Sequence, residues 1–455
     1  MVVNSTTDIV NALVSKGVLT EEEGALLTKG RTDEAAGQAK ALKKAGKVTV
    51  SDAIDNAKVY GDIRARYERR DGDVVSNNNI NSDSNRARYK ITLGVETTSG
   101  QWYSDLALAL SSNGRSDNVS MGDGLGIGTL GTSDQGAFTK EKNGIYLKRA
   151  MFGYKPTEWL AVEAGRMKNP LYMVNAMVFD HDIVMEGAQE KLKYKFGDTN
   201  VFANLGQWVY TGGGIQANDT QGTTGHQNLV LAFQVGAQNA FIDNKASIKA
   251  AIGDYNYTTR GKVTSGYYKP VIDATDVVTT ADQQIVNNLN ILDIPAEINY
   301  MAMDGIGTRL YGEYANNTDS DRYNIYCANN PTHCGGNDDK AWLVGFSVGS
   351  AKDLKSWEGK KMAKGDWFAN LWYQDTGAFA LDPNAVDTDI FDGRLNMKGT
   401  TLKAQYNATD NVLLNFTGGW ATRKNDGYGT TWTKADLNYN LKEFELYQFD
   451  VTYKF

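Results

Sequence analysis

The sequence lacks any stretch approaching the roughly 20 consecutive apolar residues that a membrane-spanning helix requires. This absence excludes a helical membrane protein. A basic excess is also missing, because 47 lysines and arginines stand against 54 aspartates and glutamates and leave a net charge of −7. Without a basic stripe, nucleic acid is not an expected partner. With 41% apolar residues among 455, the composition also excludes a collagen-like or generically disordered chain.

The N-terminus lacks the basic and apolar regions of a secretory signal peptide, since Met1-Val-Val-Asn4 is followed at once by polar residues. Read literally, this start predicts a cytoplasmic protein. The alternative is that a signal peptide has been removed and that Met1 is a remnant start codon. The remainder of the sequence favours this alternative.

Residues 1–57 have the pattern of a small helical extension. Gly17 ends a first expected helix, and Thr20 followed by three glutamates places acidic side chains in the first turn of a second. A third expected helix, rich in alanine and lysine, covers about residues 33–45. The narrow apolar stripes suit an assembly handle, a plug or a tether, and the sequence does not choose among them.

From Lys58 onward the hydrophobic period changes from 3.6 residues to 2. In residues 86–96, apolar side chains at odd positions alternate with Arg86, Arg88 and Lys90 at even ones. Residues 447–455 end the chain in the same way, with an aromatic or apolar side chain at every odd position. A strand with one apolar and one polar face must lie at a boundary between hydrocarbon and water, where the 24 tyrosines and 9 tryptophans also fit.

Sixteen such segments can be counted, at about residues 58–70, 85–97, 102–113, 143–155, 159–168, 184–196, 201–211, 228–238, 245–258, 295–302, 307–316, 340–351, 365–374, 395–406, 412–422 and 441–455. Short connections of three to six residues alternate with longer polar loops such as 375–394, and only 352–364 is long where a short turn is due. One rim of the barrel therefore carries short turns and the other carries long loops. This is the layout of a transmembrane β-barrel with short periplasmic turns and long external loops.

The predicted fold is all-β: an antiparallel transmembrane barrel of about 16 strands over residues 58–455, preceded by the helical extension of residues 1–57. In hydrocarbon every backbone N–H and C=O group needs an internal partner, so the sheet must close and have no edge. A barrel of this size is too wide for wall side chains to fill, which leaves an aqueous channel. The competing interpretation, a soluble sandwich or propeller, expects apolar residues to face inward and the two rims to be alike.

Several blocks resemble the "putative porin" family of Gram-negative bacteria. They are Leu-Lys-Arg-Ala-Met-Phe-Gly-Tyr at 147–154, Trp-Leu-Ala-Val-Glu-Ala-Gly-Arg-Met-Lys-Asn-Pro at 159–170, Asp-His-Asp at 180–182, Glu-Gly at 186–187, and the closing residues 444–455 with their terminal aromatic. The resemblance implies an outer-membrane location among membrane lipids, passive diffusion of small hydrophilic solutes, and a homotrimer.

A run of basic residues, here called the basic ladder, is the sharpest functional feature of the polar face. The alternation places on the lumen face, as pore-lining residues, the side chains of Arg64, Arg66, Arg86, Arg88 and Lys90, and further along the chain those of Lys191, Lys193 and Lys195. In a narrow tunnel of low dielectric constant such side chains raise the local concentration of anions. The alternative is that Asp62, Glu68 and Glu96 on the same face neutralise them.

In sixteen-stranded porins the third long loop folds into the lumen and narrows it, and here that loop is Pro170 to Ile183. Its apolar character, from Leu171 to Phe179, means that it should pack against something. The charged residues that bracket it are Arg166 and Lys168 on one side and Asp180, Asp182 and Glu186 on the other. We therefore predict a constriction with opposing charges that orients dipolar solutes. Contact with a neighbouring subunit is the alternative.

Cys327 and Cys334 enclose six residues within one long loop, which predicts a disulfide in an oxidising exterior. Zinc would gain only three ligands with His333, whereas structural sites want four, so neither a metal nor another cofactor is predicted. The acidic loops at 71–83 and 382–392 could bind Ca²⁺ or bridge to lipopolysaccharide, although a solvated loop is the usual case.

Three classes of function remain. The first is a water-filled diffusion channel, either non-specific or mildly anion-preferring. An outer-membrane enzyme is disfavoured, because His181, His226 and His333 fall in predicted loops and no pairing of nucleophile and base can be traced. The alternative to a channel is a structural or adhesive protein, with residues 1–57 tethering the outer membrane to the cell wall.

Overall fold

A computed structural model describes most of the predicted strands and part of the connections. The described residues are 13–16, 18–20, 22–23, 54–74, 83–111, 117–121, 144–211, 228–258, 289–320, 337–350, 354, 363–393, 395–425 and 441–455. The chain divides into two compact units: residues 1–58 with 97–100, and residues 59–96 with 101–455.

In the first unit, the described residues near Thr20 form a helix start of the predicted kind. The backbone N–H of Glu23 donates to the Thr20 hydroxyl (3.2 Å), and the Thr20 N–H donates to the Glu23 carboxylate (3.0 Å). These reciprocal bonds form a capping box, which satisfies two N–H groups that a helix end leaves unpaired. The greater part of the predicted helices lies outside the described residues.

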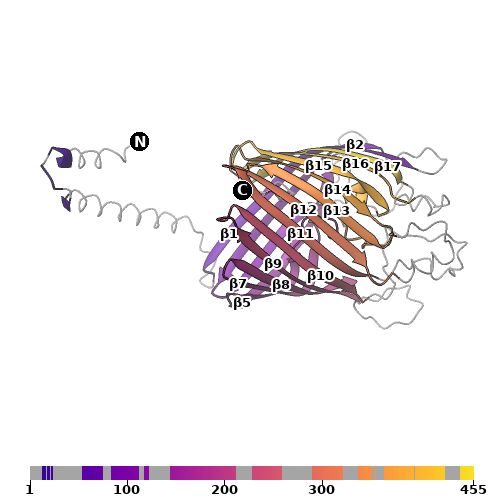
Figure 1. Ribbon diagram of the computed structural model, residues 1–455, viewed down its shortest axis with the longest axis horizontal. Coiled ribbons are helices and arrows are strands. Elements are labelled where there is room, and N and C mark those ends of the chain that lie inside the picture. The colour runs from indigo at the N-terminus through magenta and orange to yellow at the C-terminus, as the bar shows by residue number, and fades with distance from the viewer. Residues whose placement is uncertain are drawn as a thin grey trace, which may run out of the picture. The chain divides into compact units, whose positions relative to one another are not determined.

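The second unit is a closed barrel of sixteen antiparallel strands, which confirms the predicted fold (Figure 1). The wall strands are β1 (Asn56–Val74), β2 (Ser84–Ser99), β3 (Trp102–Ser111), β5 (Gly144–Thr157), β6 (Leu160–Lys168), β7 (Val184–Phe196), β8 (Thr199–Thr211), β9 (Asn228–Phe241), β10 (Ala246–Tyr257), β11 (Asn290–Met303), β12 (Ile306–Asn317), β13 (Lys340–Gly349), β14 (Trp367–Thr376), β15 (Met397–Asn407), β16 (Val412–Arg423) and β17 (Leu441–Lys454). Two short elements lie in connections, β4 (Val119–Ser120) and the 3₁₀ turn η1 (Phe391–Gly393).

The last strand closes the sheet by pairing with the first. β17 runs antiparallel to β1, with Tyr67 opposite Phe449 and Arg66 opposite Asp450. At the end of the chain, Gly61 and Phe455 exchange two backbone hydrogen bonds, at 3.2 and 3.1 Å. No edge is left at this seam, as a sheet in hydrocarbon requires.

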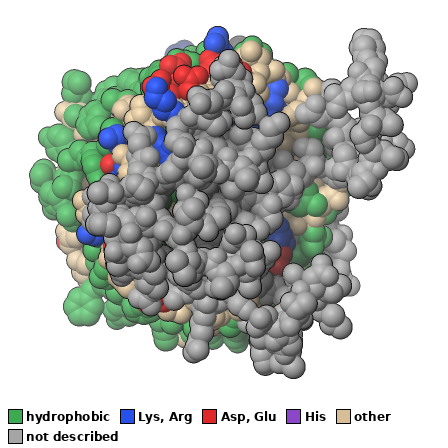
Figure 2. All heavy atoms as spheres, turned by 90° about the vertical axis from the view of Figure 1, so that its right-hand side faces the viewer, with side chains coloured by type: hydrophobic (Ala, Val, Ile, Leu, Met, Phe, Trp, Pro, Cys, Tyr) green, Lys and Arg blue, Asp and Glu red, His purple; other side chains and the backbone are tan. Residues whose placement is uncertain are grey.

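The two faces of the wall differ as the alternation predicts. On β17, Phe449 is 57% exposed on the outer face, while its neighbour Asp450 is 7% exposed on the inner face. Apolar side chains form the periphery of the barrel seen from the loop end (Figure 2). A soluble sandwich would bury these residues, so that interpretation is wrong. Among the described residues, no helix has the length and apolar character to span a bilayer.

Aromatic side chains gather near the ends of the strands. Trp102 and Trp367 begin their strands at the rim that carries the short turns and are exposed on the outer face, and the exposed Trp159 lies in one of those turns. Higher on the wall, Trp342 packs against Tyr373 with ring centroids 5.5 Å apart, and the Trp420 indole N–H donates to the Tyr447 hydroxyl. Such positions suit the two boundaries between lipid and water.

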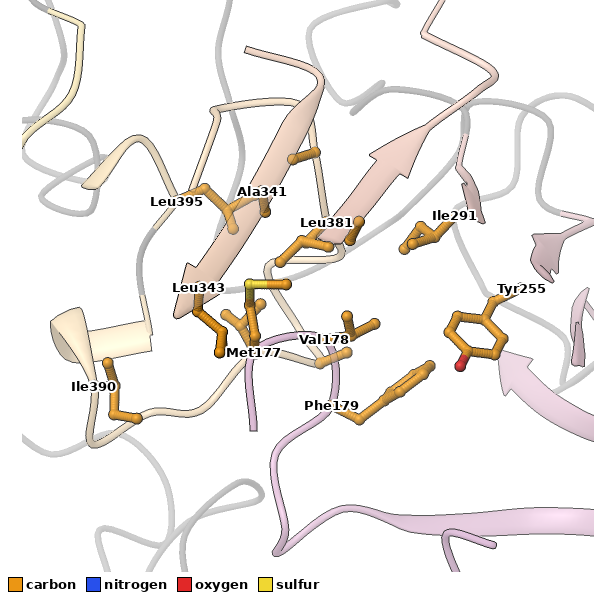
Figure 3. Packing of buried hydrophobic residues seen from close by; sticks show 14 of the residues in the cluster. Met177, Val178, Phe179, Tyr255, Ile291, Ala341, Leu343, Leu381, Ile390 and Leu395 are labelled. Atoms are coloured by element: carbon orange, nitrogen blue, oxygen red, sulfur yellow. The ribbon is translucent and has the colours of Figure 1, made fainter. Parts of the chain in front are cut away.

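Two loops fold into the barrel and share one apolar core. Residues 169–183, between β6 and β7, place Met177 and Phe179 at 1% and 3% exposure, so the predicted inward loop lies inside the barrel. Residues 377–396, between β14 and β15, bring Leu381, Ile390 and Leu395 into the same cluster (Figure 3). The expectation that residues 375–394 form an external loop is wrong, because their apolar side chains are buried against the inner wall and loop 169–183.

Candidate functional site

The basic ladder lies on the inner face of β1 and β2. Arg64, Arg66, Arg88 and Lys90 are all buried inside the barrel, and Arg70 continues the row on β1. The Arg86 side chain is more accessible, at 35% exposure. The structure therefore brings together the five residues predicted for this part of the wall.

Carboxylates from β1 and β17 partly neutralise the ladder. Asp450 receives two bonds from Arg66, from Nε to Oδ1 at 2.7 Å and from Nη2 to Oδ2 at 3.0 Å. Glu68, which is fully buried, forms ion pairs with Arg86, with Arg70 (3.3 Å) and with Arg88 (3.5 Å). Of the three acids named in the alternative hypothesis, Glu68 thus pairs with the ladder.

The remaining two acids of that hypothesis lie elsewhere on the wall. Asp62 faces Lys454 in the pairing of β1 with β17, and Glu96 lies 3.8 Å from the Lys168 ammonium.

Loop 377–396 contributes a further carboxylate to the ladder. Asp389 accepts from Arg66 Nη1 at 2.7 Å and from Arg70 Nη2 at 3.0 Å. Burial acts to raise the pKa of Asp389, but the positive charges of Arg66 and Arg70 outweigh it and hold that pKa well below its usual range. The bond pattern fixes this loop to the wall at β1.

Residues 117–121 supply a third set of acceptors. β4 pairs with β2 at Arg88 and Tyr89, and the Asp117 carboxylate contacts Lys90 (3.2 Å), Lys148 and the Tyr146 hydroxyl. Asn118 follows, with its side-chain oxygen 2.6 Å from Arg64 Nη2 and its carbonyl 3.1 Å from Arg88 Nη2.

Loop 169–183 is fixed on the opposite wall by two buried side chains. Gln234 of β9 accepts from the Tyr172 N–H at 2.7 Å and donates to the Tyr172 carbonyl at 2.9 Å. Arg309 of β12 donates to the Val174 carbonyl at 2.9 Å and to Glu297 at 2.7 Å. Phe179 meets Tyr255 edge-on, with ring centroids 5.4 Å apart. The loop therefore packs against β8–β12, on a different part of the wall from the basic ladder.

The two inward loops meet at Asp180. Its N–H donates to the Ala385 carbonyl at 2.6 Å, and its carboxylate accepts from the Thr388 N–H at 3.4 Å. Burial, together with the negative charges of Asp387 and Asp182, raises the pKa of Asp180 well above its usual range. Burial also raises the pKa of Asp387, to about 6. Asp180 is thus a contact between loops.

Asp182 is the residue of the predicted constriction that reaches the ladder. Its carboxylate lies 3.2 Å from the Lys90 ammonium and 3.8 Å from that of Lys148. Opposing charges therefore do meet at the end of loop 169–183. The basic partners, however, come from β2 and β5.

The other predicted constriction residues lie along β6 and β7. Arg166 and Glu186 face each other in the strand pairing and form an ion pair, at positions that alternate with the buried Met167 and Met185. Lys168 lies 3.5 Å from Asp105 and is exposed. Among the described residues, these side chains make no contact with Asp180 or Asp182 that would complete one ring.

Two glycines with unusual backbone angles lie beside Arg166 and Glu186. Gly165 and Gly187 face each other in the same pairing, with φ of 114° and 142°. Residues other than glycine rarely adopt such φ values, and a Cβ at either position would lie within 2.3 Å of a neighbouring carbonyl oxygen. The glycines of the Gly165-Arg166 and Glu186-Gly187 pairs thus have a steric cause.

The predicted pore-lining lysines of β7 occupy alternate positions toward the short-turn end. Lys191 pairs with the buried Glu163, while Lys193 and Lys195 are exposed. Glu163 also accepts from the Tyr103 hydroxyl at 2.6 Å.

Two predicted features receive no test from the structure or only a partial one. Cys327 and Cys334 lie outside the described residues, so the disulfide stays a prediction. Of the acidic loops, Asp71 pairs with Arg69 at 2.6 Å, and Asp83 accepts from the Gly72 N–H. Within the part of the chain that is described, no group of three potential ligands is placed to hold a metal ion.

Sequence reasoning missed the loop-borne acids and one lysine. Asp117 and Asp389 come from connections of unknown path, and alternation assigns a face only within a strand. Lys148 is hidden by an irregularity: Arg149 faces Ala107 while Leu147 faces Leu108, so the extra residue breaks the period of two. The alternation alone places Arg70 and Asp450 on the inner face, so these two residues could have been predicted from the sequence.

The chain is similar to known proteins in sequence and in structure. The model of the family described as "putative porin" matches residues 66–287 and 274–427. Solved structures that are similar include the outer membrane channel DcaP of Acinetobacter baumannii, at 11% identity over 89% of this chain and 99% of that one, with a TM-score of 0.43. OprB of Pseudomonas putida shares 10% identity over 88% and 94%, with a TM-score of 0.49. OmpF of Salmonella typhi shares 11% over 89% and 99%, with a TM-score of 0.44.

No curated protein matches the sequence significantly. The family match, by contrast, covers well over half of the chain, from the basic residues of β1 to the end of β16. On this match, and with a closed wall whose outer face is apolar, the chain belongs to the "putative porin" family and is an outer-membrane β-barrel channel.

Proposed function

We propose that the protein is a porin through which small hydrophilic solutes and ions diffuse passively, with a mild preference for anions. The observation that carries this proposal is the asymmetry of the interior. The apolar core formed with the two inward loops lies mainly against β8–β16, which also bury Asp293, Glu313 and the Arg309–Glu297 ion pair, whereas charged side chains predominate on the inner face of β1–β7. Water and solutes pass along the charged side.

The charge balance of that side supports the preference. Seven basic side chains (Arg64, Arg66, Arg70, Arg86, Arg88, Lys90 and Lys148) share contacts with five acidic ones (Glu68, Asp117, Asp182, Asp389 and Asp450). Lys193 and Lys195 add two exposed positive charges toward the short-turn rim. The excess is small, so the preference is mild. In a narrow interior a small fixed excess still biases the local ion concentration.

The expected assembly is a homotrimer in contact with membrane lipids and lipopolysaccharide, and the mature chain is expected to follow removal of a signal peptide. We propose no enzymatic role. Residues 1–57 would serve as a periplasmic extension of the channel.

Planar-bilayer recording of the purified protein tests the proposal. In a KCl gradient the reversal potential should report chloride as the more permeant ion, and a trimer should insert in steps of three equal current levels. A reversal potential of the opposite sign would contradict the anion preference. Electrical silence of correctly folded protein would favour the alternative, a structural protein that tethers the membrane to the cell wall.

A further inference from the structure

We infer that the wall around Lys90 and Lys148 is a binding site for small organic carboxylates, and that the Asp117 side chain occupies it as a tethered competitor. The inference rests on the proposed channel function and adds a binding site to it. The site consists of donors on wall strands, and the acceptors that fill it come from connecting segments.

The donors converge on a single carboxylate. The Tyr146 hydroxyl donates to Asp117 Oδ1, and the ammonium groups of Lys90 and Lys148 both contact Oδ2, the first at 3.2 Å. The lysine side chains are 4% and 10% exposed. Two buried ammonium groups around one carboxylate oxygen leave a positive charge that Asp117 does not neutralise alone. Asp182 supplies the second negative charge, at 3.2 and 3.8 Å.

An irregularity in the wall places one of these donors. Lys148 and Arg149 are consecutive in β5, yet both are buried inside the barrel. This is possible because the register with β3 shifts at this point, so that Lys148 is the extra residue of a bulge. Bulges re-aim side chains and are frequent beside functional sites. The bulge adds a cation to the inner face that a regular strand would not present there.

The acceptors resemble a small ligand in chemistry. Asp117 presents a carboxylate, and the next residue presents two amide oxygens to Arg64 (2.6 Å) and Arg88 (3.1 Å). Backbone pairing of β4 with β2, including a bond from the Met121 N–H to the Ala87 carbonyl at 2.8 Å, holds the segment in place. A solute carboxylate therefore needs to displace the Asp117 side chain alone. These strand bonds can remain.

The consequence is competition between a tethered and a free carboxylate. A tethered ligand acts at an effective concentration of the order of millimolar, so it weakens the apparent affinity for a free ligand of the same chemistry. Dilute solutes then pass without being retained, which suits a diffusion channel. Removing the charge of Asp117 should expose the full affinity of the wall.

The test is the concentration dependence of single-channel conductance in potassium acetate, for wild type and Asp117→Asn. Conductance that saturates reports a binding site, and its half-saturating acetate concentration should fall about tenfold in the variant. Glu96→Gln is the matched control, because it removes one negative charge from the same strand face as Lys90, beside the exposed Lys168. It should leave the half-saturating concentration unchanged. Asp117→Ala is a second variant, because the amide of Asp117→Asn could itself bond to the donors, and it should show the same fall in half-saturating concentration. Heat-modifiable gel mobility checks that each variant is folded.

Adding Lys148→Gln to Asp117→Asn or to Asp117→Ala should abolish the fall in half-saturating acetate concentration, because it removes a donor of the site. Equal half-saturating concentrations in wild type and Asp117→Asn would overturn the inference, and so would an equal shift in Glu96→Gln. Either result leaves the channel function standing. Absence of conductance in wild type would instead contradict the proposed function itself.

Discussion

The two sides of the barrel interior differ in the side chains that predominate on the inner face. Along β1–β7 the inner face carries buried ions such as Arg66, Lys90 and Glu163, each matched by a partner from a strand or a loop. Along β8–β16 the inner face carries mainly apolar residues such as Trp208 and Trp372, which pack against loops 169–183 and 377–396, and the Arg309–Glu297 ion pair is buried among them. Burying each large apolar side chain contributes roughly 1.5–3 kcal/mol, so the loops are held mainly by the apolar side. The comparison teaches that the two inward loops are packed chiefly against one half of the wall, whereas polar bonds and ion pairs predominate on the other half, along which we propose that water passes.

Removing the apolar part of loop 169–183 should give the largest effect. Deletion of residues 171–179 takes Val174, Met177 and Phe179 out of the interior, and single-channel conductance should rise at least about twofold because the interior of a sixteen-stranded barrel is wide enough for an aqueous channel. Unchanged conductance in a folded variant would mean that the loop does not narrow the path.

Breaking the contact between loop 377–396 and the charged side should come next. Asp389→Asn removes one carboxylate that Arg66 and Arg70 share, while Asp450 still pairs with Arg66 and Glu68 with Arg70. The cost should therefore stay below the roughly 3–5 kcal/mol of a buried charge left without any partner. Thermal unfolding should shift to lower temperature, and chloride selectivity should increase. Asp71→Asn, which breaks the exposed pair with Arg69, is the control and should leave thermal unfolding nearly unchanged, because solvent screens an exposed pair. Equal effects of the two substitutions would remove the distinction between buried and exposed pairs.

The anchor of loop 169–183 on the apolar side should matter somewhat less. Gln234→Leu leaves the N–H and C=O groups of Tyr172 unpaired in a buried position, at about 1–3 kcal/mol for each group. Single-channel current noise should increase as the loop loosens. Gln238→Leu, four residues along the same face of β9, controls for the substitution itself. Quiet recordings from Gln234→Leu would show that apolar packing alone fixes the loop.

The contact between the two loops should give a smaller, pH-dependent effect. Here docking means the contact of loop 377–396 with loop 169–183. Docking raises the pKa of Asp387 from its ordinary 3.8 to about 6 and also raises the pKa of Asp180, so the docked state binds more protons than the undocked one. The contact between the two loops therefore weakens as pH rises from about 4 through the raised pKa of Asp387 at about 6, and the raised pKa of Asp180 acts in the same direction. Below about pH 4, the lowered pKa of Asp389 makes docking weaken as pH falls.

Conductance should accordingly increase between pH 4 and 6, by less than about twofold, since the apolar core remains. In Asp387→Asn, which mimics the protonated side chain, the profile should be flatter over the same range. A profile in Asp387→Asn identical to that of wild type would assign the pH response to other groups.

Much of the wall was predictable because a strand in a membrane obeys a period of two. Strand β7 begins and ends at the predicted residues, 184 and 196. Strand β11 begins at Asn290, five residues before the predicted start at Pro295. Pro295 lies within the strand, and the pairing with β10 has a gap between Ala296 and Asp293, where the missing N–H of proline is tolerated.

The interior was less predictable, because loops have no such period. The apolar residues of loop 169–183 indicated that it packs inward, and the same criterion applied to Phe379, Leu381 and Ile390 would have revealed the second loop. The path of residues 117–121 had no comparable signal in the sequence. The partners of the basic ladder that come from connecting segments, Asp117 and Asp389, therefore needed the structure, whereas the ladder and its strand-borne partners did not.

Accessibility of single cysteines tests most directly whether water follows the charged side. In a Cys327→Ser, Cys334→Ser background, Lys193→Cys and Ala232→Cys place one thiol on each inner wall, the first exposed and the second buried under the apolar core. A charged methanethiosulfonate reagent added during bilayer recording should reduce the current stepwise at residue 193 and leave it unchanged at residue 232. Rapid modification at 232 with none at 193 would contradict the account.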